Sequence, residues 1–363
     1  MAAGEIQPWL RLGLIPGISS STQLKLLQAF GSPDAICSAA RTQLSPYLKP
    51  KQLDGFLNGP DSTLLAQTLT WLREPSNHLV TLADEDYPKR LLETVDPPVM
   101  FYLKGRRELL GSTMLAIVGS RHATPQGEQN ARAFSEALSH ASLTIVSGMA
   151  HGIDRAAHEG GLTGPGSSIA VVGTGLDRVY PASNRDLAHQ LATNGAILSE
   201  YPLGVPPLAA NFPKRNRIIS GMSVGCLVVE AALQSGSLIT ARLSADQGRE
   251  VFAIPGSIHS PVAKGCHALI KQGAKLVETA QDILDELRWQ VTPPISHKLP
   301  PTPLQGDPEE ALLLECMSFD PTAIDTLCDR SNLTPDKVCA ILLKLELDGQ
   351  VASLPGSRYQ RLV

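Results

Sequence analysis

The densest group of side chains that could bind a ligand is the basic run Lys214-Arg215-Asn216-Arg217, which places three cations within four positions. Arginine binds phosphate oxygens through two parallel N–H donors, and lysine adds a mobile positive charge. A basic run of this kind usually lies on a solvated surface. This one is embedded among apolar and glycine residues, just before an apolar run at 224–229. The pattern therefore predicts an anion-binding site.

Small-residue turns recur at the ends of apolar runs, and each opens a predicted helix. Such turns direct backbone N–H groups and helix N-termini toward one edge of a sheet, where anions bind. Basic side chains lie beside several of them, which predicts a ligand with several phosphates in a row. The turns are Gly119-Ser120-Arg121, Ser147-Gly148, Gly173-Thr174-Gly175 and Ser235-Gly236-Ser237.

The patterns of catalytic and cofactor sites are absent or incomplete in the sequence. Gly173 and Gly175 are followed by Arg178 where a dinucleotide-binding turn needs its third glycine, and neither a P-loop nor a GxSxG motif occurs. His151 and His158 could share a helix face. A hydrogen-bonded structural pair is favoured there over a metal site, because a third ligand is not nearby. We therefore expect a protein that is not an enzyme, with no catalytic residue, no metal and no cofactor.

The composition is that of a globular chain, with 363 residues, 43% hydrophobic and 18% charged, which suggests two or three domains. The net charge of −4 looks unfavourable for a nucleic-acid partner, but residues 305–363 alone hold 5 cations and 10 anions. The remainder is close to neutral, and its cations cluster locally. The sequence shows no bilayer-spanning apolar run, signal peptide or paired cysteine spacing. These features predict a cytoplasmic protein with no membrane partner.

From Met114 onward, apolar runs alternate with helical patterns. This alternation predicts a mainly parallel sheet covered on both faces, a doubly wound α/β fold. Ligands bind such sheets beyond the carboxyl ends of the strands, where the small-residue turns lie. Strands at 79–82 and 99–103 are expected to extend one edge. The other predicted strands are 114–118, 143–147, 168–173, 196–200, 224–230, 250–254 and 275–277, and the predicted helices are 125–140, 152–160, 183–193, 214–221, 237–247, 265–272 and 279–288.

Three domains and one linker are predicted along the chain. The turn Ile15-Pro16-Gly17-Ile18 could belong to a phosphate-binding helix-hairpin-helix, but only Lys25 lies nearby as a cation, so a helical bundle packed on the main domain is favoured. The acidic helix at 334–348 favours a protein contact over DNA reading. The predicted segments are a helical domain at 1–75, the Rossmann-like domain at 76–288, a Pro-rich linker at 289–308 and a winged-helix domain at 309–363.

The motifs of the central region resemble those of the DNA-processing protein DprA (Smf) family. The resemblance implies an extended Rossmann-like domain that binds single-stranded DNA without hydrolysing it. It also implies a homodimer formed through that domain, which loads the RecA recombinase onto incoming strands during natural transformation. The matching motifs lie at 119–121, 147–154, 173–181, 199–202, 212–221, 228–231, 235–241 and 251–256, within a region of roughly residues 80–288.

The same resemblance assigns roles to individual residues. Phe212 and Tyr201 are candidates for base stacking, although a core role is favoured for Phe212. His267 stands where many family members have asparagine. The implied phosphate contacts are Arg121, Lys214, Arg215 and Arg217, the implied turn donors are Gly119, Ser120, Ser147, Gly148, Ser235, Gly236 and Ser237, and Asn216, Lys264 and His267 complete the site.

An alternative is a Rossmann-like phosphoribohydrolase that acts on nucleoside monophosphates. In those enzymes a glutamate follows a glycine-rich turn. Here Glu230 precedes the corresponding turn at 234–240. The order of the two features therefore favours a DNA-binding mediator over a nucleotide-hydrolysing enzyme.

Overall fold

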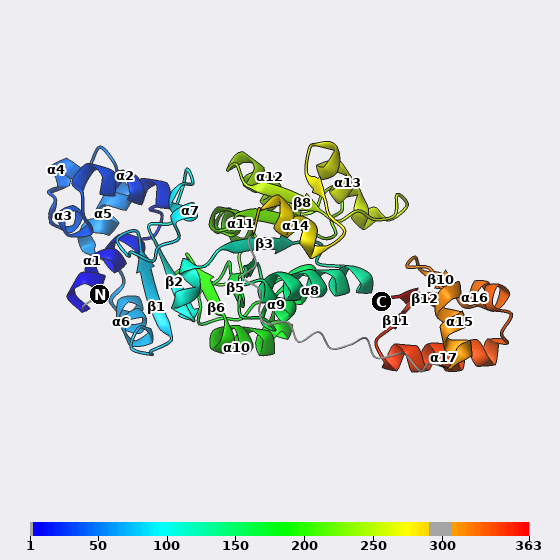
Figure 1. The fold of residues 1–363 in the computed structure, drawn as a ribbon. Coiled ribbons are helices and arrows are strands. Elements are labelled where there is room, and N and C mark those ends of the chain that lie inside the picture. The colour runs from blue at the N-terminus through cyan, green and yellow to red at the C-terminus, as the bar shows by residue number, and fades with distance from the viewer. Residues whose placement is uncertain (1–2, 290–306, 363) are drawn as a thin grey trace.

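The computed structural model describes residues 3–289 and 307–362. Its central feature is a nine-stranded sheet in the order β1-β2-β6-β5-β4-β3-β7-β8-β9 (Figure 1). Strands β3 to β9 pair in parallel, whereas β1 and β2 are antiparallel and extend the sheet beyond β6. The predicted parallel sheet and its two added edge strands are confirmed.

The strands are short and most of them are buried on both faces, as expected for a sheet between two helical layers. Their bounds agree with the predicted ranges to within a few residues. They are β1 (Asn77–Thr81), β2 (Met100–Gly105), β3 (Met114–Val118), β4 (Thr144–Ser147), β5 (Ser168–Val171), β6 (Ala196–Ser199), β7 (Gly225–Val228), β8 (Glu250–Ala253) and β9 (Lys275–Leu276).

Helices cover both faces of the sheet, which confirms the doubly wound fold. Side chains alternate along β3, so Leu115 and Ile117 pack in the core under α8 and α9, while Ala116 and Val118 pack in the core under α11. The α-helices of this region are α7 (Lys89–Leu92), α8 (Pro125–His140), α9 (Ile153–Gly161), α10 (Arg185–Asn194), α11 (Asn211–Met222), α12 (Ser237–Asp246), α13 (Lys264–Lys271) and α14 (Ala280–Glu286); short 3₁₀ turns are η1 (Arg107–Gly111), η2 (Ala182–Asn184) and η3 (Pro261–Ala263).

Helix starts follow from capping residues where the sequence supplies them. The bounds of α8 match the prediction, because Thr124 caps its N-terminus by accepting from the Gly127 N–H at 3.0 Å and Pro125 takes the first helical position. Helix α11 instead begins at Asn211, three residues before the predicted start. Pro213 is accommodated there because the first N–H groups of a helix lack intrahelical partners.

The N-terminal helices pack directly on the sheet edge. Trp9, Leu10 and Leu14 share one buried cluster with β1 and β2 residues such as Leu79 and Tyr102, while a second cluster lies among the helices themselves. The favoured packed bundle is therefore the arrangement observed. These helices are α1 (Ala3–Gly13), α2 (Ser20–Phe30), α3 (Pro33–Ser38), α4 (Arg41–Leu44), α5 (Pro50–Asn58) and α6 (Ser62–Trp71).

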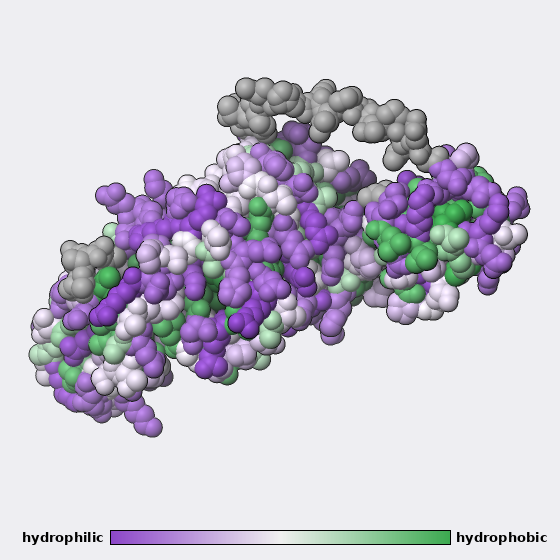
Figure 2. All heavy atoms as spheres, turned by 90° about the horizontal axis from the view of Figure 1, so that it is seen from below, coloured by the Kyte–Doolittle hydropathy of each residue, from purple (hydrophilic) through white to green (hydrophobic). Residues whose placement is uncertain are grey.

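The C-terminal segment has the predicted winged-helix outline around its own buried cluster. Hydrophobic residues are visible on its surface in Figure 2, where the winged helix lies at the right. Most of the predicted linker falls at 290–306, outside the described residues. No helix in the described ranges is long and apolar enough to cross a membrane. The elements are α15 (Pro308–Cys316), β10 (Thr322–Ala323), α16 (Ile324–Ser331), α17 (Pro335–Leu347), β11 (Val351–Leu354) and β12 (Arg358–Arg361).

His158 is buried on α9 and fixes the turn that precedes this helix. Its Nε2 accepts a hydrogen bond from the Met149 N–H at 3.2 Å, and its Nδ1 lies 2.7 Å from the Ser168 hydroxyl. Because that hydroxyl donates to the Ile145 carbonyl at 2.9 Å, it accepts from His158, and Nδ1 carries the proton. His151 lies exposed in the turn, so the expected pair of histidines does not form.

The buried His158 should make stability depend on pH. Burial lowers its pKa from 6.5 to about 3, so the unfolded chain takes up a proton that the folded protein does not. The stabilisation is therefore present above pH 6.5 and is lost as the pH falls toward 3. At about 1.4 kcal/mol per pH unit, roughly 2 kcal/mol should be lost between pH 6.5 and 5.

Urea unfolding at both pH values, with wild-type protein and His158→Gln, measures this contribution. The variant should show the smaller loss between pH 6.5 and 5. A His140→Gln control, at an exposed histidine on α8, should behave like wild-type. Equal pH dependence in wild-type and His158→Gln would contradict the assignment.

Candidate nucleic-acid interface

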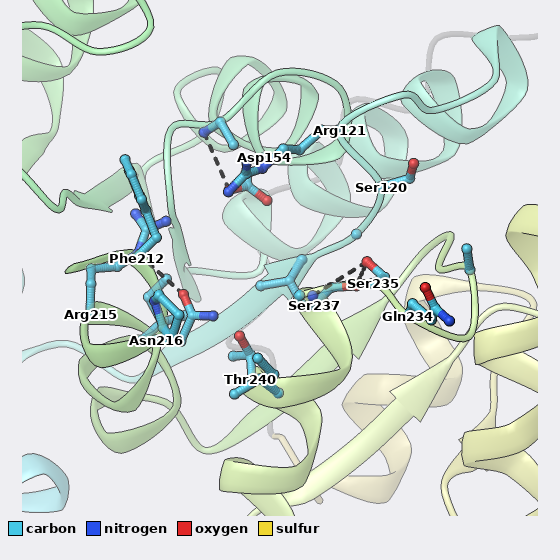
Figure 3. A pocket seen from close by; sticks show the side chains of 18 of the residues that line it. Ser120, Arg121, Asp154, Phe212, Arg215, Asn216, Gln234, Ser235, Ser237 and Thr240 are labelled. Atoms are coloured by element: carbon cyan, nitrogen blue, oxygen red, sulfur yellow. Dashed lines mark hydrogen bonds between the residues drawn. The ribbon is translucent and has the colours of Figure 1, made fainter. Parts of the chain in front are cut away.

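A cavity of about 640 Å³ opens at the carboxyl ends of β3 and β7, the edge predicted to bind the ligand. We call it the central cavity. Its walls are the loop at 119–122, the first turns of α11 and the turn at 234–237 that leads into α12. Figure 3 shows side chains from these segments around a common space. The predicted site residues brought together here are Gly119, Ser120, Arg121, Arg215, Asn216, Ser235, Gly236 and Ser237.

Arg121 is the exposed cation of the central cavity. Its guanidinium carbon lies 5.7 Å from the centre of the Phe212 ring, a cation–π distance. Within the described residues this guanidinium forms no ion pair, although its charge acts on the buried Asp154 carboxylate of the same cavity. Its charge and its N–H donors are therefore available to an anion in the cavity.

The loop that carries Arg121 is held by close backbone packing. Gly152 adopts a φ of +69°, and a Cβ placed on it would lie 2.4 Å from the Ser120 carbonyl oxygen. The next residue, Ile153, donates its N–H to that same carbonyl at 3.2 Å. A Cβ on Gly119 would lie 2.5 Å from the Ile153 side chain. Glycine is thus needed on both sides of this contact, which sets the position of Arg121.

The opposite wall is the N-terminal end of α12. Gly236 occupies the N-cap position and gives the helix no side-chain cap. The next three N–H groups are bonded locally: that of Ser237 to the Ser235 hydroxyl at 3.4 Å, that of Leu238 to the Ser235 carbonyl at 3.2 Å and that of Ile239 to the Gly236 carbonyl at 3.1 Å. The Ser235 and Ser237 hydroxyls lie 2.7 Å apart beside it. A helix N-terminus carries a partial positive charge. The turn at 235–237 therefore presents the positive end of α12 to the central cavity.

Arg215 lies in the cavity wall but is only 4% exposed. It donates to the Gly148 carbonyl at 2.6 Å and to the Val171 carbonyl, which joins the ends of β4 and β5. Burial lowers its pKa to about 10, so it stays charged at neutral pH. A Cβ on Gly148 would approach both Arg215 Nη2 and Asp154 Oδ2 to 2.6 Å. Arg215 therefore stabilises the strand ends beneath the cavity; the phosphate contact that the family resemblance implies for it stays a prediction.

Ser147 and Gly148 support the site from beneath. Ser147 is fully buried and donates its hydroxyl to the Ile117 carbonyl at 2.6 Å. Gly148 supplies one of the carbonyls that hold Arg215. Neither residue lines the central cavity. Their positions show a structural contribution to the strand ends, and the donor roles that the family resemblance implies for them stay a prediction.

Lys214 and Arg217 lie on the other face of α11 from the central cavity. They line a separate cavity of about 920 Å³, shared with the turn between α1 and α2. Arg217 is paired there with Glu200 at 2.5 Å and Asp96 at 3.6 Å. Lys214 is exposed, and within the described chain it has no ion-pair partner. The basic run is therefore divided by helical periodicity, and Arg217 is largely neutralised.

Lys264 and His267, on α13, lie away from the central cavity. The Lys264 ammonium donates to the Ile258 carbonyl, and His267 Nε2 lies 3.0 Å from the Gly256 oxygen. Both contacts hold the loop between β8 and α13. The structure thus separates these two predicted site residues from Arg121 and the α12 turn.

An aromatic pair at the cavity was only partly predicted. Tyr180 and Phe212 both line the central cavity, with ring centres 5.6 Å apart, and Tyr180 is 46% exposed. Tyr201, the other predicted stacking residue, lines the cavity beside Lys214 and directs its hydroxyl to the Asn211 carbonyl at 3.3 Å. Tyr180 follows the glycine turn at 173–175 in a matched motif, and this position is the signal that could have identified it.

The acidic residues near the site form hydrogen bonds within the protein. Asp154 is buried and accepts from the Ala150 N–H at 3.3 Å; burial raises its pKa, and the charge of Arg215 opposes this. Glu230 accepts from the Thr124 N–H and hydroxyl at 2.9 and 2.6 Å, at the start of α8. Within the described ranges no group of three or more His, Cys, Asp or Glu is placed to hold a metal ion.

Comparison with known proteins identifies the family. Residues 78–288 match the family model of DNA recombination-mediator protein A, and residues 297–357 match that of the DprA winged helix domain. The chain belongs to the DprA (Smf) family. Protein Smf of Escherichia coli K12 is 41% identical over 364 residues, which covers 98% of this chain and 95% of that protein.

Two solved DprA structures share the fold. The protein from Streptococcus pneumoniae superposes with a TM-score of 0.67 at 35% identity, covering 79% of this chain and 98% of that one. The protein from Helicobacter pylori superposes with a TM-score of 0.53 at 30% identity, covering 58% of this chain and 96% of that one. The Helicobacter pylori structure concerns the single-stranded DNA binding mode of that protein.

Gly152→Ala should disturb the loop that carries Arg121. A Cβ at this position meets the Ser120 carbonyl and also strains a positive φ, which together should cost about 1–3 kcal/mol of unfolding free energy. Gly17→Ala is the matched control, since Gly17 has a φ of +83° and a Cβ added there would have no neighbour within 4 Å.

Urea unfolding and amide hydrogen exchange at 119–122 test this prediction. Gly152→Ala should lose more stability than Gly17→Ala and should expose the loop amides to faster exchange. If both variants lose the same stability and the loop amides are unchanged, the contact with Ser120 does not position the loop.

Proposed function

We propose that this protein is a recombination mediator that binds single-stranded DNA in the central cavity and does not cleave it. The observation that carries the proposal is Arg121, an exposed guanidinium with no ion pair among the described residues, in the same cavity as the N-terminal end of α12. These two features supply positive charge and N–H donors to successive phosphates. The single-stranded DNA binding described for the Helicobacter pylori relative supports the same ligand class.

The aromatic pair favours a single strand over a duplex. Tyr180 and Phe212 present rings within the same cavity as Arg121. Unpaired bases can stack on such rings, and stacking contributes about 1–3 kcal/mol per base with little regard to sequence. Bases in a duplex are already stacked on one another and offer only their edges. We therefore propose sequence-tolerant binding that prefers unpaired strands.

The engaged carboxylates argue against the phosphoribohydrolase alternative. Glu230 is the glutamate nearest in sequence to the α12 turn, yet its carboxylate is bound by Thr124 at the start of α8. Asp154 is 8% exposed and accepts a backbone N–H. Both groups contribute to the fold of the cavity walls, which supports binding without hydrolysis.

We further propose that the bound strand is transferred to a RecA recombinase and that the protein acts as a homodimer through its Rossmann-like domain. Support comes from the family description, recombination mediator. Light scattering measures the oligomer, and RecA filament formation on strands coated with a single-strand-binding protein measures the transfer. A monomer in solution would refute the homodimer. A rate of RecA filament formation that this protein does not change would refute the transfer to RecA.

Arg121→Ala should weaken single-strand binding for all sequences alike. Loss of one phosphate contact should flatten the dependence of log affinity on log salt concentration by about 0.7. Fluorescence anisotropy with labelled single-stranded and duplex oligonucleotides, titrated against salt, measures both quantities. Arg73→Ala is a suitable control, since Arg73 is an exposed arginine after α6, away from the cavity. Unchanged affinity and slope in Arg121→Ala would overturn this site.

The winged helix should contribute little to strand binding. The two lysines of α17 are occupied by α15: Lys337 bonds Glu309 at 2.6 Å, and Lys344 bonds Glu310. The same helix exposes Leu343 and Leu347, at 60% and 81%. A surface with neutralised lysines and exposed leucines suits a protein contact better than a polyanion.

Deletion of residues 305–363 should therefore leave most single-strand affinity intact. The expected change in the dissociation constant is less than about tenfold, or 1.4 kcal/mol. Anisotropy with the truncated and full-length proteins at the same salt concentration measures it. A larger loss would assign the winged helix a direct part in DNA binding.

A further inference from the structure

A second basic cavity lies next to the Arg121 loop. It has a volume of about 610 Å³ and is formed by residues 121–122, the first half of α8, the turn at 151–152 and helix α9. We call it the α8/α9 cavity. Three arginines, two histidines and two glutamates meet there: Arg121, Arg132, Arg155, His122, His151, Glu128 and Glu159.

The arginines of the α8/α9 cavity are only partly compensated. Arg132 and Arg155 share one carboxylate, that of Glu159, and the Arg155 contact measures 2.8 Å. Each guanidinium has five N–H donors, and in the described structure each uses one on Glu159. The side chains of Arg132 and Arg155 are 46% and 50% exposed. Several donors on each therefore remain open to a ligand.

Glu159 orients these arginines while leaving a surplus of positive charge. Burial alone would raise the pKa of Glu159, but hydrogen bonds from Arg132 and Arg155 bring it below its ordinary value. The carboxylate is thus ionised at neutral pH and holds both guanidinium groups at the cavity. With Glu128 included, three arginines and two glutamates line the cavity, and this surplus of one positive charge attracts phosphate.

The two cavities are adjacent along the same loop. Arg121 and His122 line both of them. Arg121 contacts the Phe212 ring in the central cavity, and within the described residues it forms no ion pair. A single strand that leaves the central cavity past residues 121 and 122 therefore meets Arg132 and Arg155 next.

We propose that the α8/α9 cavity binds internal phosphodiesters of the DNA strand that occupies the central cavity. One strand then contacts the two cavities in succession. This inference rests on the proposed function and extends it. Single strands suit such a path because their backbone is flexible enough to turn across a loop, and successive phosphates follow one another at short spacing. In the α8/α9 cavity, Arg132 and Arg155 contact the strand, and Glu159 is their positioning residue.

The test compares long and short strands in the full-length protein. A double variant, Arg132→Gln with Arg155→Gln, removes both guanidinium groups, and Arg41→Gln is the control because it removes one exposed, ion-paired arginine from the N-terminal helices. Exposed ion pairs contribute little to folding, so the variants should fold normally. Anisotropy is measured with thymidine strands of about 6 and about 30 nucleotides, sizes chosen to fill one or both cavities.

The double variant should bind the long strand roughly tenfold more weakly, with a salt slope lower by about 1.4 for two lost contacts, and should bind the short strand like wild-type. Glu128→Gln, which removes a negative charge from the same cavity, should change long-strand affinity in the opposite direction, by about twofold or more. A purely structural role for these residues would not produce opposite signs.

Three other outcomes overturn the proposal. Equal long-strand affinity in the double variant and in Arg41→Gln would show that the strand does not reach the α8/α9 cavity. A defect seen only with strands that carry a terminal phosphate would assign the cavity to a strand end instead. Failure of the wild-type protein to bind either strand would refute the proposed function itself. That result differs from normal wild-type binding with no long-strand defect in the double variant, which would refute only the role of the α8/α9 cavity.

Discussion

The carboxyl edge of the sheet depends on one buried guanidinium. Arg215 reaches back from α11 and bonds the carbonyls of Gly148 and Val171, at the ends of two neighbouring strands. A buried charge is costly unless it is hydrogen-bonded and compensated, and Asp154 supplies part of the compensation. The same guanidinium lies 5.9 Å from the centre of the Phe212 ring. This one side chain therefore contacts the strand ends, the helix and the aromatic wall of the cavity.

Most of the fold could be predicted because its signals are local. Apolar runs mark the strands, and Thr124 with Pro125 marks the start of α8. The start of α11 was placed too late because Asn211 and Phe212 carry no comparable capping signal, and the N-cap position is Ala210 with no side-chain hydrogen bond. Local signals also account for the two edge strands, since turn residues bracket each one.

The candidate site could be predicted only in part, because it depends on which face of a helix each cation occupies. The basic run is continuous in sequence, yet α11 directs Arg215 under the sheet edge and Lys214 and Arg217 toward the N-terminal helices. Helical periodicity could have predicted that these cations lie on different faces of α11. It could not have predicted which of them is buried. Arg132 and Arg155 were not identified at all, since they lie on different helices and share Glu159 only in the folded chain.

The distribution of charge explains how a chain of net charge −4 can suit a polyanion. Electrostatic attraction acts over about 10 Å at moderate salt. A local surplus of positive charge near the binding site therefore matters more than the net charge of the chain. At the 119–122 loop, Arg121 stands between two cavities that share it. In the winged helix, by contrast, Lys337 and Lys344 are held by glutamates of α15. Arg121 is thus available to a strand at a loop whose backbone is fixed by close packing of Gly119 and Gly152 against neighbouring residues.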